Sequence, residues 1–258
     1  MKLLNNKETR TAVILCGGRG TRLGSVTKKI PKSLVQIKGK PIIWYILKIL
    51  KQNKFNHFIL PIGYKGDQIK EYLKKKIFKN FNIKIVPTGT NTPIAKRIFT
   101  IKKHIQSENF LLLNGDAIFD CNLDKIYRDH SQNKKTFITF LGSETILPYG
   151  TIVLSKGLVK NFERDVVFNA VKLASKRDNI AYVYSGMAIL KNTILNENIK
   201  NIKNFESELY PRIIQKYNCK FQKLSGFWHS IDNIKDVKIL KSDKSKKFKI
   251  NKLFKKLK

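Results

Sequence analysis

The sequence of Thr11–Ser33, TAVILCGGRGTRLGSVTKKIPKS, holds the first predicted strand and much of the predicted chemistry. Its apolar run Ala12–Cys16 stops at the glycine-rich segment Gly17–Gly20, which predicts a buried parallel strand running into a tight turn. Glycines can take positive φ and bring successive N–H groups close to an anion. Cationic side chains follow in and after the turn: Arg19, Arg22, Lys28, Lys29 and Lys32. We therefore expect this loop to bind a ligand rich in phosphate.

Two better-known glycine motifs do not fit this stretch. The dinucleotide-binding pattern would place a glycine at Leu23, and the nucleoside-triphosphatase loop would need G-K-[ST] at Gly20-Thr21-Arg22. The observed G-G-x-G-T-R-L, followed by Pro31-Lys32, instead resembles the sugar-1-phosphate nucleotidylyltransferase family. An ordinary glycine turn would explain the glycines, but not the pairing of Arg22 with Pro31-Lys32.

The resemblance implies a role for each matching residue of this stretch. Arg22 would stabilise the leaving pyrophosphate, and Lys32 would contact the α-phosphate and the incoming sugar phosphate. Nucleotide binding is expected from Gly17, Gly18, Arg19, Gly20 and Thr21.

The length and charge of the chain limit its architecture and its partners. Its 258 residues fit one domain with insertions. The 52 Lys and Arg against 18 Asp and Glu give a net charge of +34, which would suit nucleic acid or an anionic membrane. These basic residues are mostly lysines spread among many Asn and Ile, as an AT-rich genome would produce. We therefore expect no nucleic-acid partner.

The cysteines and the apolar runs bear on the compartment. Cys16, Cys121 and Cys219 lie far apart and form no C-x-x-C pair, which favours a reduced, cytoplasmic protein. The first ten residues lack the apolar core of a signal peptide, and no run of about 18 apolar residues could span a bilayer. We expect a soluble protein.

Strand-like and helix-like segments alternate after the glycine turn. Residues 42–51 have apolar positions at helical spacing, with Pro41 near the first turn, and residues 55–62 follow as a strand. Asp67 is placed to cap a helix over residues 68–76, and residues 81–86 form another strand. This order predicts an α/β fold with a mostly parallel, Rossmann-like (GT-A-like) sheet flanked by helices.

The segment after the third predicted strand resembles a base-reading loop. Thr88-Gly89-x-x-Thr92 followed by Arg97 is similar to the glucose-1-phosphate cytidylyltransferase branch of the family. The small glycines usual before that arginine are Ala95 and Lys96 here. The resemblance implies that Thr88, Gly89, Thr92 and Arg97 bind the nucleotide and favours cytosine, whereas a polar loop that caps the next helix is the alternative.

Two aspartates are predicted to hold a metal. Asp116 follows the apolar run of residues 110–113, and ligands bind at the carboxyl ends of strands in open α/β sheets. The family's G-D at this position binds Mg²⁺, and the W-x-x-x-D of residues 228–232 implies Asp232 as the second ligand. Asp124 is expected to cap a helix that runs through His130, and His229 to be structural beside Trp228.

A β-rich insertion is predicted between residues 136 and 190, where strand-like segments follow one another. It resembles the sugar-binding part of the family, which implies that the sugar phosphate is bound by Tyr149, Gly150, Glu163, Arg164, Ser185 and Gly186. The usual E-K-P motif reads Glu163-Arg164-Asp165 here, so a surface pair of solvated charges remains the alternative. The segment of residues 205–211 resembles the family's aromatic-Glu-x-x-x-Pro element, which supports the sugar pocket.

We divide the chain into a nucleotidyltransferase domain, residues 1–240, and a basic C-terminal tail, residues 241–258. Ile250, Leu253, Phe254 and Leu257 would share one face of a helix in the tail. That face could contact an anionic membrane surface weakly, pack against the domain or a second subunit, or stay unfolded.

The predicted activity is nucleotidyl transfer from a nucleoside triphosphate, with CTP favoured, to a sugar 1-phosphate for polysaccharide precursor synthesis, with Mg²⁺ as cofactor. Residues 15–18 and 114–120 also resemble heptose-1-phosphate guanylyltransferases, and a thymidylyltransferase would share the chemistry. A non-catalytic protein that binds nucleotide-sugars or an anionic surface is the alternative of another class. The sequence leaves open whether the chain forms a homo-oligomer.

Overall fold

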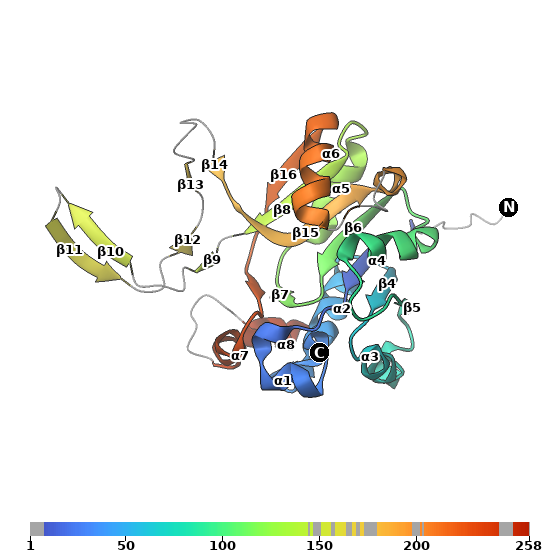
Figure 1. Ribbon diagram of the computed structural model, residues 1–258, viewed down its shortest axis with the longest axis horizontal. Coiled ribbons are helices and arrows are strands. Elements are labelled where there is room, and N and C mark those ends of the chain that lie inside the picture. The colour runs from blue at the N-terminus through green and yellow to red at the C-terminus, as the bar shows by residue number, and fades with distance from the viewer. Residues whose placement is uncertain are drawn as a thin grey trace.

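The computed structural model describes residues 8–143, 145–146, 151–155, 158–163, 167–168, 171–172, 180–197, 202, 204–242 and 250–257. At its centre lies a seven-stranded sheet with the order β16-β8-β15-β6-β1-β4-β5 (Figure 1). In that order the strands span Cys219–Lys223, Ile138–Ser143, Val183–Lys191, Asn109–Asn114, Thr11–Leu15, His57–Ile62 and Asn82–Pro87. β1 pairs in parallel with β4 and β6, and β4 with β5. The predicted α/β fold with a mostly parallel sheet is confirmed.

One strand of the sheet runs against the others. β15 is antiparallel to both of its neighbours, so that Met187 pairs with Leu113 of β6 and with Leu141 of β8. Between β8 and β15 the chain forms short antiparallel pairs, which account for the predicted β-rich insertion. These pairs are β9 (Thr145–Ile146) with β12 (Val167–Phe168), β10 (Thr151–Ser155) with β11 (Leu158–Glu163), and β13 (Val171–Lys172) with β14 (Ile180–Ala181).

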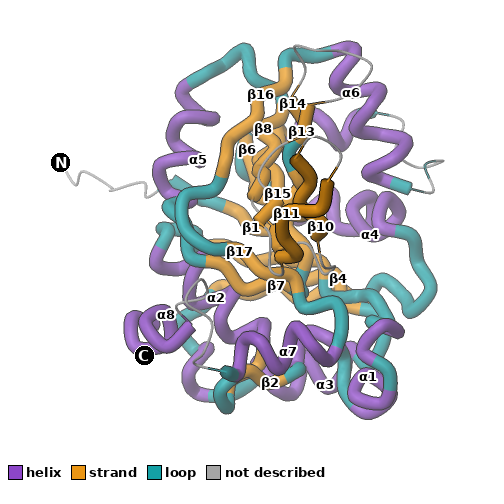
Figure 2. The backbone as a smooth tube through the Cα atoms, turned by 90° about the vertical axis from the view of Figure 1, so that its left-hand side faces the viewer, coloured by secondary structure: helices purple, strands orange, loops and turns teal. Residues whose placement is uncertain are grey.

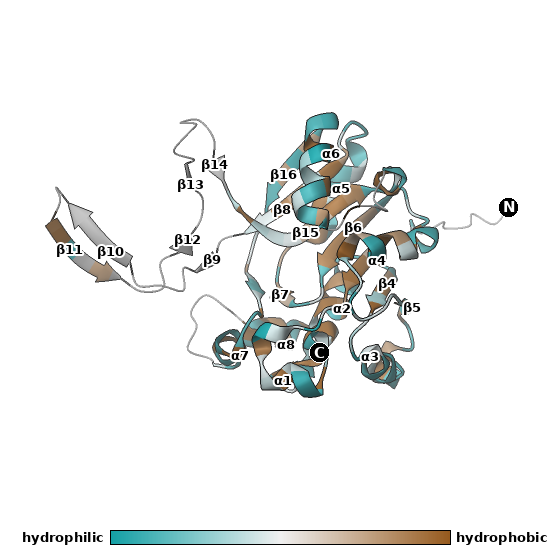
Figure 3. Cartoon of the chain, in the orientation of Figure 1, coloured by the Kyte–Doolittle hydropathy of each residue, from teal (hydrophilic) through white to brown (hydrophobic). Residues whose placement is uncertain are grey.

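Helices cover both faces of the sheet (Figure 2). One face carries α2 (Ile42–Gln52), α3 (Gly66–Leu73) and α5 (Leu123–Gln132), and the other carries α4 (Ile94–Ile101) and α6 (Tyr210–Lys216). Successive side chains of a strand point to opposite faces, so Ala12 and Ile14 join the first core while Val13 joins the second. Burial on both faces explains the unbroken apolar runs of the central strands, which are brown in Figure 3.

Two predicted helix caps are wrong. α3 begins at Gly66 after Lys65, and Asp67 lies in its first turn, where it pairs with Lys70 at 2.9 Å. The cap of α5 is Asn122, whose side chain accepts a hydrogen bond from the backbone N–H of Lys125.

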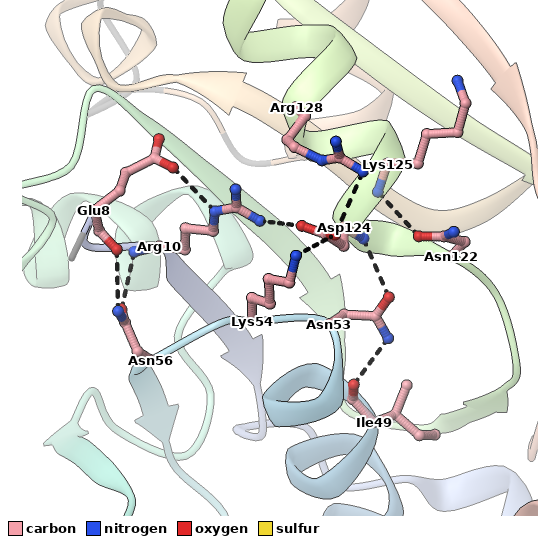
Figure 4. A network of polar contacts seen from close by, with 10 residues as sticks. All are labelled: Glu8, Arg10, Ile49, Asn53, Lys54, Asn56, Asn122, Asp124, Lys125 and Arg128. Atoms are coloured by element: carbon pink, nitrogen blue, oxygen red, sulfur yellow. Dashed lines mark hydrogen bonds and ion pairs between the residues drawn. The ribbon is translucent and has the colours of Figure 1, made fainter.

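Asp124 instead joins the start of α5 to two distant parts of the chain (Figure 4). Its carboxylate pairs with Arg10, which precedes β1, and with Lys54, which follows α2. The side chain of Asn53 also accepts from the Asp124 backbone N–H. These contacts fasten the ends of two helices to the first strand, at the sheet edge opposite the candidate site described below.

The C-terminal helix α8 (Ile250–Leu257) packs on α2. Ile250, Leu253 and Leu257 are buried, and the ring of Phe254 lies with its centroid 5.9 Å from that of Trp44. The apolar face considered for membrane contact is therefore covered by the fold, and the predicted boundary after residue 240 falls at the end of α7 (Ile234–Lys241). Within the described residues, no helix has the length and apolar character needed to cross a bilayer.

Candidate active site

The candidate site lies where the parallel strands end. β1 leads into Gly17–Gly20, β4 into Gly63, β5 into residues 88–92, and β6 into Gly115-Asp116. All four strands point the same way, so their following loops meet at one edge of the sheet.

The glycine loop forms one wall of a polar cleft. Gly20 has φ 62°, and its carbonyl accepts a hydrogen bond from Thr27 Oγ1 at 2.9 Å. A Cβ on Gly20 would lie 3.0 Å from Cβ of Lys32, so this position favours glycine in both conformation and space. The cleft has a volume of about 240 Å³ and is lined by Gly18, Gly20, Thr21, Arg22, Lys32 and Asp116, among others. The structure thus brings together most of the residues predicted from the first motif.

A small antiparallel ribbon delivers the second aspartate. β7 (Ala117–Phe119), which directly follows Asp116, pairs with β17 (Trp228–Ser230), and the backbone N–H of Ile231 donates to the Asp116 carbonyl at 2.9 Å. Asp232 therefore lies beside Asp116 despite the length of chain between them. The structure thus brings the two aspartates named from their motifs next to one another.

Lys32 joins the two carboxylates. Its Nζ lies 2.8 Å from Asp116 Oδ2 and 3.1 Å from Asp232 Oδ1, and Arg22 Nη1 lies 3.4 Å from the same Asp232 oxygen. Burial alone would raise the pKa of Asp232, but Lys32, the Ser230 hydroxyl and Arg22 together lower it. Both carboxylates face the cations of the cleft, and Asp232 stays ionised at neutral pH.

The donor set fits a magnesium ion. No group of three or more His, Cys, Asp or Glu side chains within the described residues is arranged around a common metal position. Two carboxylate oxygens, from Asp116 and Asp232, nevertheless converge on one cation, the Lys32 ammonium. Mg²⁺ prefers hard oxygen ligands and commonly takes only one or two carboxylates, because substrate phosphates and water complete its shell.

Residues around Asp232 hold it in place, and the sequence motifs did not identify them. Ser230 Oγ donates to Asp232 Oδ2 at 2.9 Å, and Asp236 Oδ2 accepts from the Asp232 backbone N–H at 2.7 Å. Asp236 is also the third residue of a capping box that starts α7 at Asn233. The spacing of Asn233 and Asp236 before an apolar helix is a signal that could have found this support. His229 lies half-buried next to it, with Nε2 3.6 Å from Asp236 Oδ1, which suits the structural role expected for this histidine.

In the predicted base-reading loop, hydroxyl groups bind the protein's own backbone. Thr88 Oγ1 donates to the Ile62 carbonyl at 2.8 Å, and Thr92 Oγ1 donates to the Thr88 carbonyl. Gly89 has φ 87°, and a Cβ there would lie 2.7 Å from Thr92 Oγ1. These bonds fix the shape of the loop, while Thr90 and Asn91 at its tip are exposed.

The two predicted arginines of the nucleotide site differ in exposure. Arg19 is on the surface, where Nε donates to Asn91 Oδ1 at 3.1 Å and so links the glycine loop to the base-reading loop. Arg97 is 4% exposed and lies beneath both loops, with its guanidinium bound to the carbonyls of Gly17 and Thr90. Its described contacts are internal to the protein.

The predicted sugar site is described only in part. Ser185 is buried, and its hydroxyl donates to the Leu141 carbonyl at 2.7 Å. Gly186 has φ 70°, and a Cβ there would lie 2.5 Å from Nδ2 of Asn114, the last residue of β6. The backbone of Glu163 ends β11 but its side chain lies outside the described structure, as do Tyr149, Gly150 and Arg164.

Near Ser185 lies an aromatic cavity, most of whose lining residues were not predicted from the sequence. The segment of residues 205–211 was nevertheless expected to support the sugar pocket. The cavity has a volume of about 460 Å³, and its lining includes Phe140, Tyr182, Tyr184, Glu206, Tyr210 and Phe221. Partial burial raises the pKa of Glu206, and the negative charge of Asp116 adds to this effect. The cavity therefore lies within electrostatic reach of Asp116.

A family model, the nucleotidyl transferase model, matches residues 11–237. The chain belongs to the nucleotidyl transferase family. The match begins at β1 and includes the glycine loop, both aspartates and the insertion, so the resemblance to sugar-1-phosphate nucleotidylyltransferases is confirmed. The chain is accordingly a nucleotidyltransferase.

Relatives within the nucleotidyl transferase family differ in the base they are named for. A probable glucose-1-phosphate cytidylyltransferase of Bacillus subtilis is 32% identical over 88% of this chain and 92% of its own length. A D-glycero-alpha-D-manno-heptose 1-phosphate guanylyltransferase of Campylobacter jejuni is 35% identical over 60% of this chain and 68% of its own length. The solved structure of HddC from Yersinia pseudotuberculosis complexed with GMP-PN has a TM-score of 0.64 and 25% identity, and the match covers 90% of this chain and 97% of that one.

Proposed function

We propose that this nucleotidyltransferase uses CTP and a sugar 1-phosphate, and that it forms a nucleotide-sugar for polysaccharide precursor synthesis. The observation that supports nucleotidyl transfer most directly is the contact of Lys32 with both Asp116 and Asp232 beside the glycine loop. The cytidylyltransferase of Bacillus subtilis supports CTP, as do the Thr88-to-Arg97 pattern and the Trp228-to-Asp232 motif.

The reaction joins two anions, so its barrier is largely electrostatic. An oxygen of the sugar phosphate forms a bond to the α-phosphorus, and the bond from that phosphorus to the β-phosphate oxygen breaks, which releases pyrophosphate. In this proposal Lys32, which lies beside Asp116, contacts the α-phosphate and the acceptor phosphate, and the exposed Arg22 contacts the leaving pyrophosphate. The attacking phosphate is already ionised at neutral pH, so no side chain needs to act as a base.

Asp116 and Asp232 are the residues that would bind Mg²⁺ in the cleft. When Mg²⁺ is bound by Asp116 and Asp232, it supplies positive charge that polarises the α-phosphate. Ser230 and Asp236 keep the Asp232 carboxylate and backbone in position for that role. The N–H groups of the glycine loop orient the remaining phosphates.

The acceptor sugar would lie on the β15 side of the metal site. Gly186 brings its backbone against Asn114 at that point, and Val183 and Tyr184 of the same strand line the aromatic cavity that contains Glu206. Sugar rings stack on aromatic side chains, and a carboxyl group can accept hydrogen bonds from hydroxyl groups. A hexose or heptose phosphate fits this chemistry.

GTP with a heptose 1-phosphate is the second candidate. It is favoured by the identity of 35% to the Campylobacter jejuni guanylyltransferase and by the likeness to the Yersinia structure that holds GMP-PN. A loop that hydrogen-bonds one base edge leaves its own polar groups unpaired with the other base, so the two candidates predict opposite preferences.

The decisive experiment measures pyrophosphate release with each of CTP, GTP, UTP, ATP and dTTP against a panel of hexose and heptose 1-phosphates, with Mg²⁺. The proposal expects the highest kcat/KM with CTP. A higher value with GTP and a heptose 1-phosphate would select the second candidate, and absence of pyrophosphate with every pair would reject the assigned substrates.

A further inference from the structure

Three loops of the candidate site meet at the guanidinium of Arg97, which comes from α4. Its Nη2 donates to the Gly17 carbonyl of the glycine loop at 3.1 Å and to the Thr90 carbonyl of the base-reading loop at 3.1 Å. Its Nη1 donates to Thr88 Oγ1 at 2.6 Å, and that hydroxyl in turn donates to Ile62 at the end of β4. One side chain therefore spans the ends of β1, β4 and β5.

Glycines leave the space that the guanidinium fills. A Cβ on Gly17 would lie 2.1 Å from Nη1 of Arg97, and a Cβ on Gly63 would lie 2.7 Å from the same atom. The carbonyl of Gly17 also accepts a hydrogen bond from the backbone N–H of Tyr64 at 3.2 Å, so the loop after β4 and the Arg97 side chain of α4 both hold it. Packing this close means that the loops cannot shift independently of Arg97.

The charge of Arg97 is costly where it lies. The side chain is 4% exposed, its described hydrogen bonds go to backbone carbonyls and a hydroxyl, and none of them joins it to a carboxylate. A buried cation without an ionic partner is destabilising compared with an apolar side chain that fills the same space. Such a cation beneath a loop that binds phosphate is compensated when an anion occupies that loop.

The bonds of Arg97 also set the direction of two peptide groups. In a trans peptide the C=O and the next N–H point opposite ways. Because Arg97 holds the Gly17 carbonyl, the N–H of Gly18 is turned away from Arg97 toward the cleft that Gly18 lines. Because it holds the Thr90 carbonyl, the N–H of Asn91 is likewise turned toward the exposed side of the base-reading loop.

We propose that Arg97 is a positioning residue that couples base recognition to phosphate placement, by fixing the glycine loop and the base-reading loop to one another. This inference rests on the proposed nucleotidyl transfer. A base that fits the loop at residues 88–92 stabilises the peptide orientation at Gly17-Gly18, and a base that does not fit leaves the phosphates misplaced. Arg97 acts in this way through Gly17, Thr88 and Thr90, to which its described hydrogen bonds go.

The test compares Arg97→Lys and Arg97→Ala with the wild type and with Lys96→Ala as a matched control, because Lys96 is an exposed cation on the same helix. kcat and KM are measured for the best and the next-best triphosphate, and folding is followed by the melting temperature. A lysine ammonium cannot reproduce the planar fork that reaches both loops. We expect Arg97→Lys to stay folded, to lose about tenfold or more in kcat/KM with the best triphosphate, and to lose less with the other. Lys96→Ala should match the wild type.

Chemical rescue separates positioning from a general loss of stability. Guanidinium or methylguanidinium added at low millimolar concentration to Arg97→Ala should restore both activity and base discrimination, whereas equal sodium chloride should not. Equal losses for both triphosphates in Arg97→Lys, or unchanged discrimination in every variant, would overturn the inference. A wild type that releases no pyrophosphate with any pair would instead reject the proposed function; nucleotide affinities from calorimetry would then decide on Arg97, which is refuted if base selectivity is the same in Arg97→Lys.

Discussion

Asp116 carries a negative charge that the proposed reaction needs and the fold does not. Its side chain is partly exposed, and its described contact is with Lys32. Changing it to Asn keeps the shape but removes the charge that holds Mg²⁺ and opposes the Lys32 ammonium. We expect Asp116→Asn to lower kcat by about 10² or more with an unchanged melting temperature, as measured by pyrophosphate release and thermal unfolding.

The control for Asp116 is Asp67→Asn, which removes a carboxylate whose side chain is 95% exposed on α3. It should leave kcat unchanged. Near-normal turnover in Asp116→Asn would remove this aspartate from the proposed mechanism, whatever the control shows.

His130 gives the fold a dependence on pH that is unrelated to catalysis. It is buried between Thr139 and Asn109, with ring nitrogens 2.8 Å and 3.2 Å from their side-chain oxygens. Burial lowers its pKa from 6.5 to about 4, and nearby Lys191 contributes. The folded state therefore holds the neutral ring, while the unfolded chain takes up a proton as the pH falls below 6.5.

The stability due to neutral His130 is fully present above pH 6.5 and is lost as the pH falls toward 4. We expect the free energy of unfolding to drop by about 2 kcal/mol more between about pH 7.5 and pH 5 in the wild type than in His130→Gln. Urea titrations of both proteins at the two pH values measure this. Parallel losses in the two proteins would show that His130 titrates normally in the fold.

Among the helices, α8 makes a clear contribution to stability. Leu253 is 1% exposed in its contact with the core, and the backbone carbonyl of Lys256 accepts a hydrogen bond from Gln52 of α2 at 2.9 Å. Replacing Leu253 by Ala should cost about 2 to 4 kcal/mol of unfolding free energy, since it removes buried methyl groups and leaves a cavity. Lys252→Ala, which alters an exposed residue of the same helix, should change it by less than about 0.5 kcal/mol.

Urea unfolding of these variants tests whether α8 packs on α2. Co-sedimentation with anionic vesicles tests whether its apolar face binds a membrane instead. If α8 packs on α2, Leu253→Ala should be destabilised. Binding to anionic vesicles should then be no stronger than the positive charge alone gives a cationic protein. Equal stability of the two variants, together with loss of vesicle binding only in Leu253→Ala, would place the apolar face on the membrane instead.

The elements near the first motif were predictable because local pattern determines them. The apolar run before Gly17 and the helical spacing after Pro41 each reflect burial within one segment, and both elements form where expected. The helix caps expected at Asp67 and Asp124 do not form, and for Asp124 the reason is a partner that lies far away in the sequence. Asp124 is recruited by Arg10, more than a hundred residues earlier, and no local pattern reports such a partner.

The candidate site shows the same limit. Asp116 and Asp232 could be named because each lies in its own motif, but their approach depends on the pairing of β7 with β17, which spacing does not reveal. The burial of Arg97 was equally hidden. An arginine after a base-reading loop is consistent with a ligand contact, and only the packing of its guanidinium against Gly17 and Gly63 shows that its described hydrogen bonds are internal.

At the scale of the whole molecule, the net charge of +34 should influence how fast an anionic substrate arrives. Long-range attraction raises association rates and is screened by salt. We expect kcat/KM for the triphosphate to fall about threefold or more as NaCl rises from about 50 to about 250 mM, with kcat nearly constant. Steady-state kinetics over that range test this, and a constant kcat/KM would mean that the lysines do not steer the substrate.

The place where the β-rich insertion joins the sheet bears on how such enzymes diversify. Ser143 at the end of β8 and Val183 at the start of β15 are direct partners in the ladder, so residues 144–182 leave and return at one point. A segment with adjoining ends can be lengthened or exchanged at little cost to the sheet. The residues proposed to handle the triphosphate and the metal all lie outside it. Because the segment holds Tyr149, Gly150, Glu163 and Arg164 of the proposed sugar-phosphate site, changes in it could alter the choice of sugar while the donor machinery stays the same. A chimera carrying this segment from a relative should therefore shift its preference among sugar 1-phosphates but keep its base.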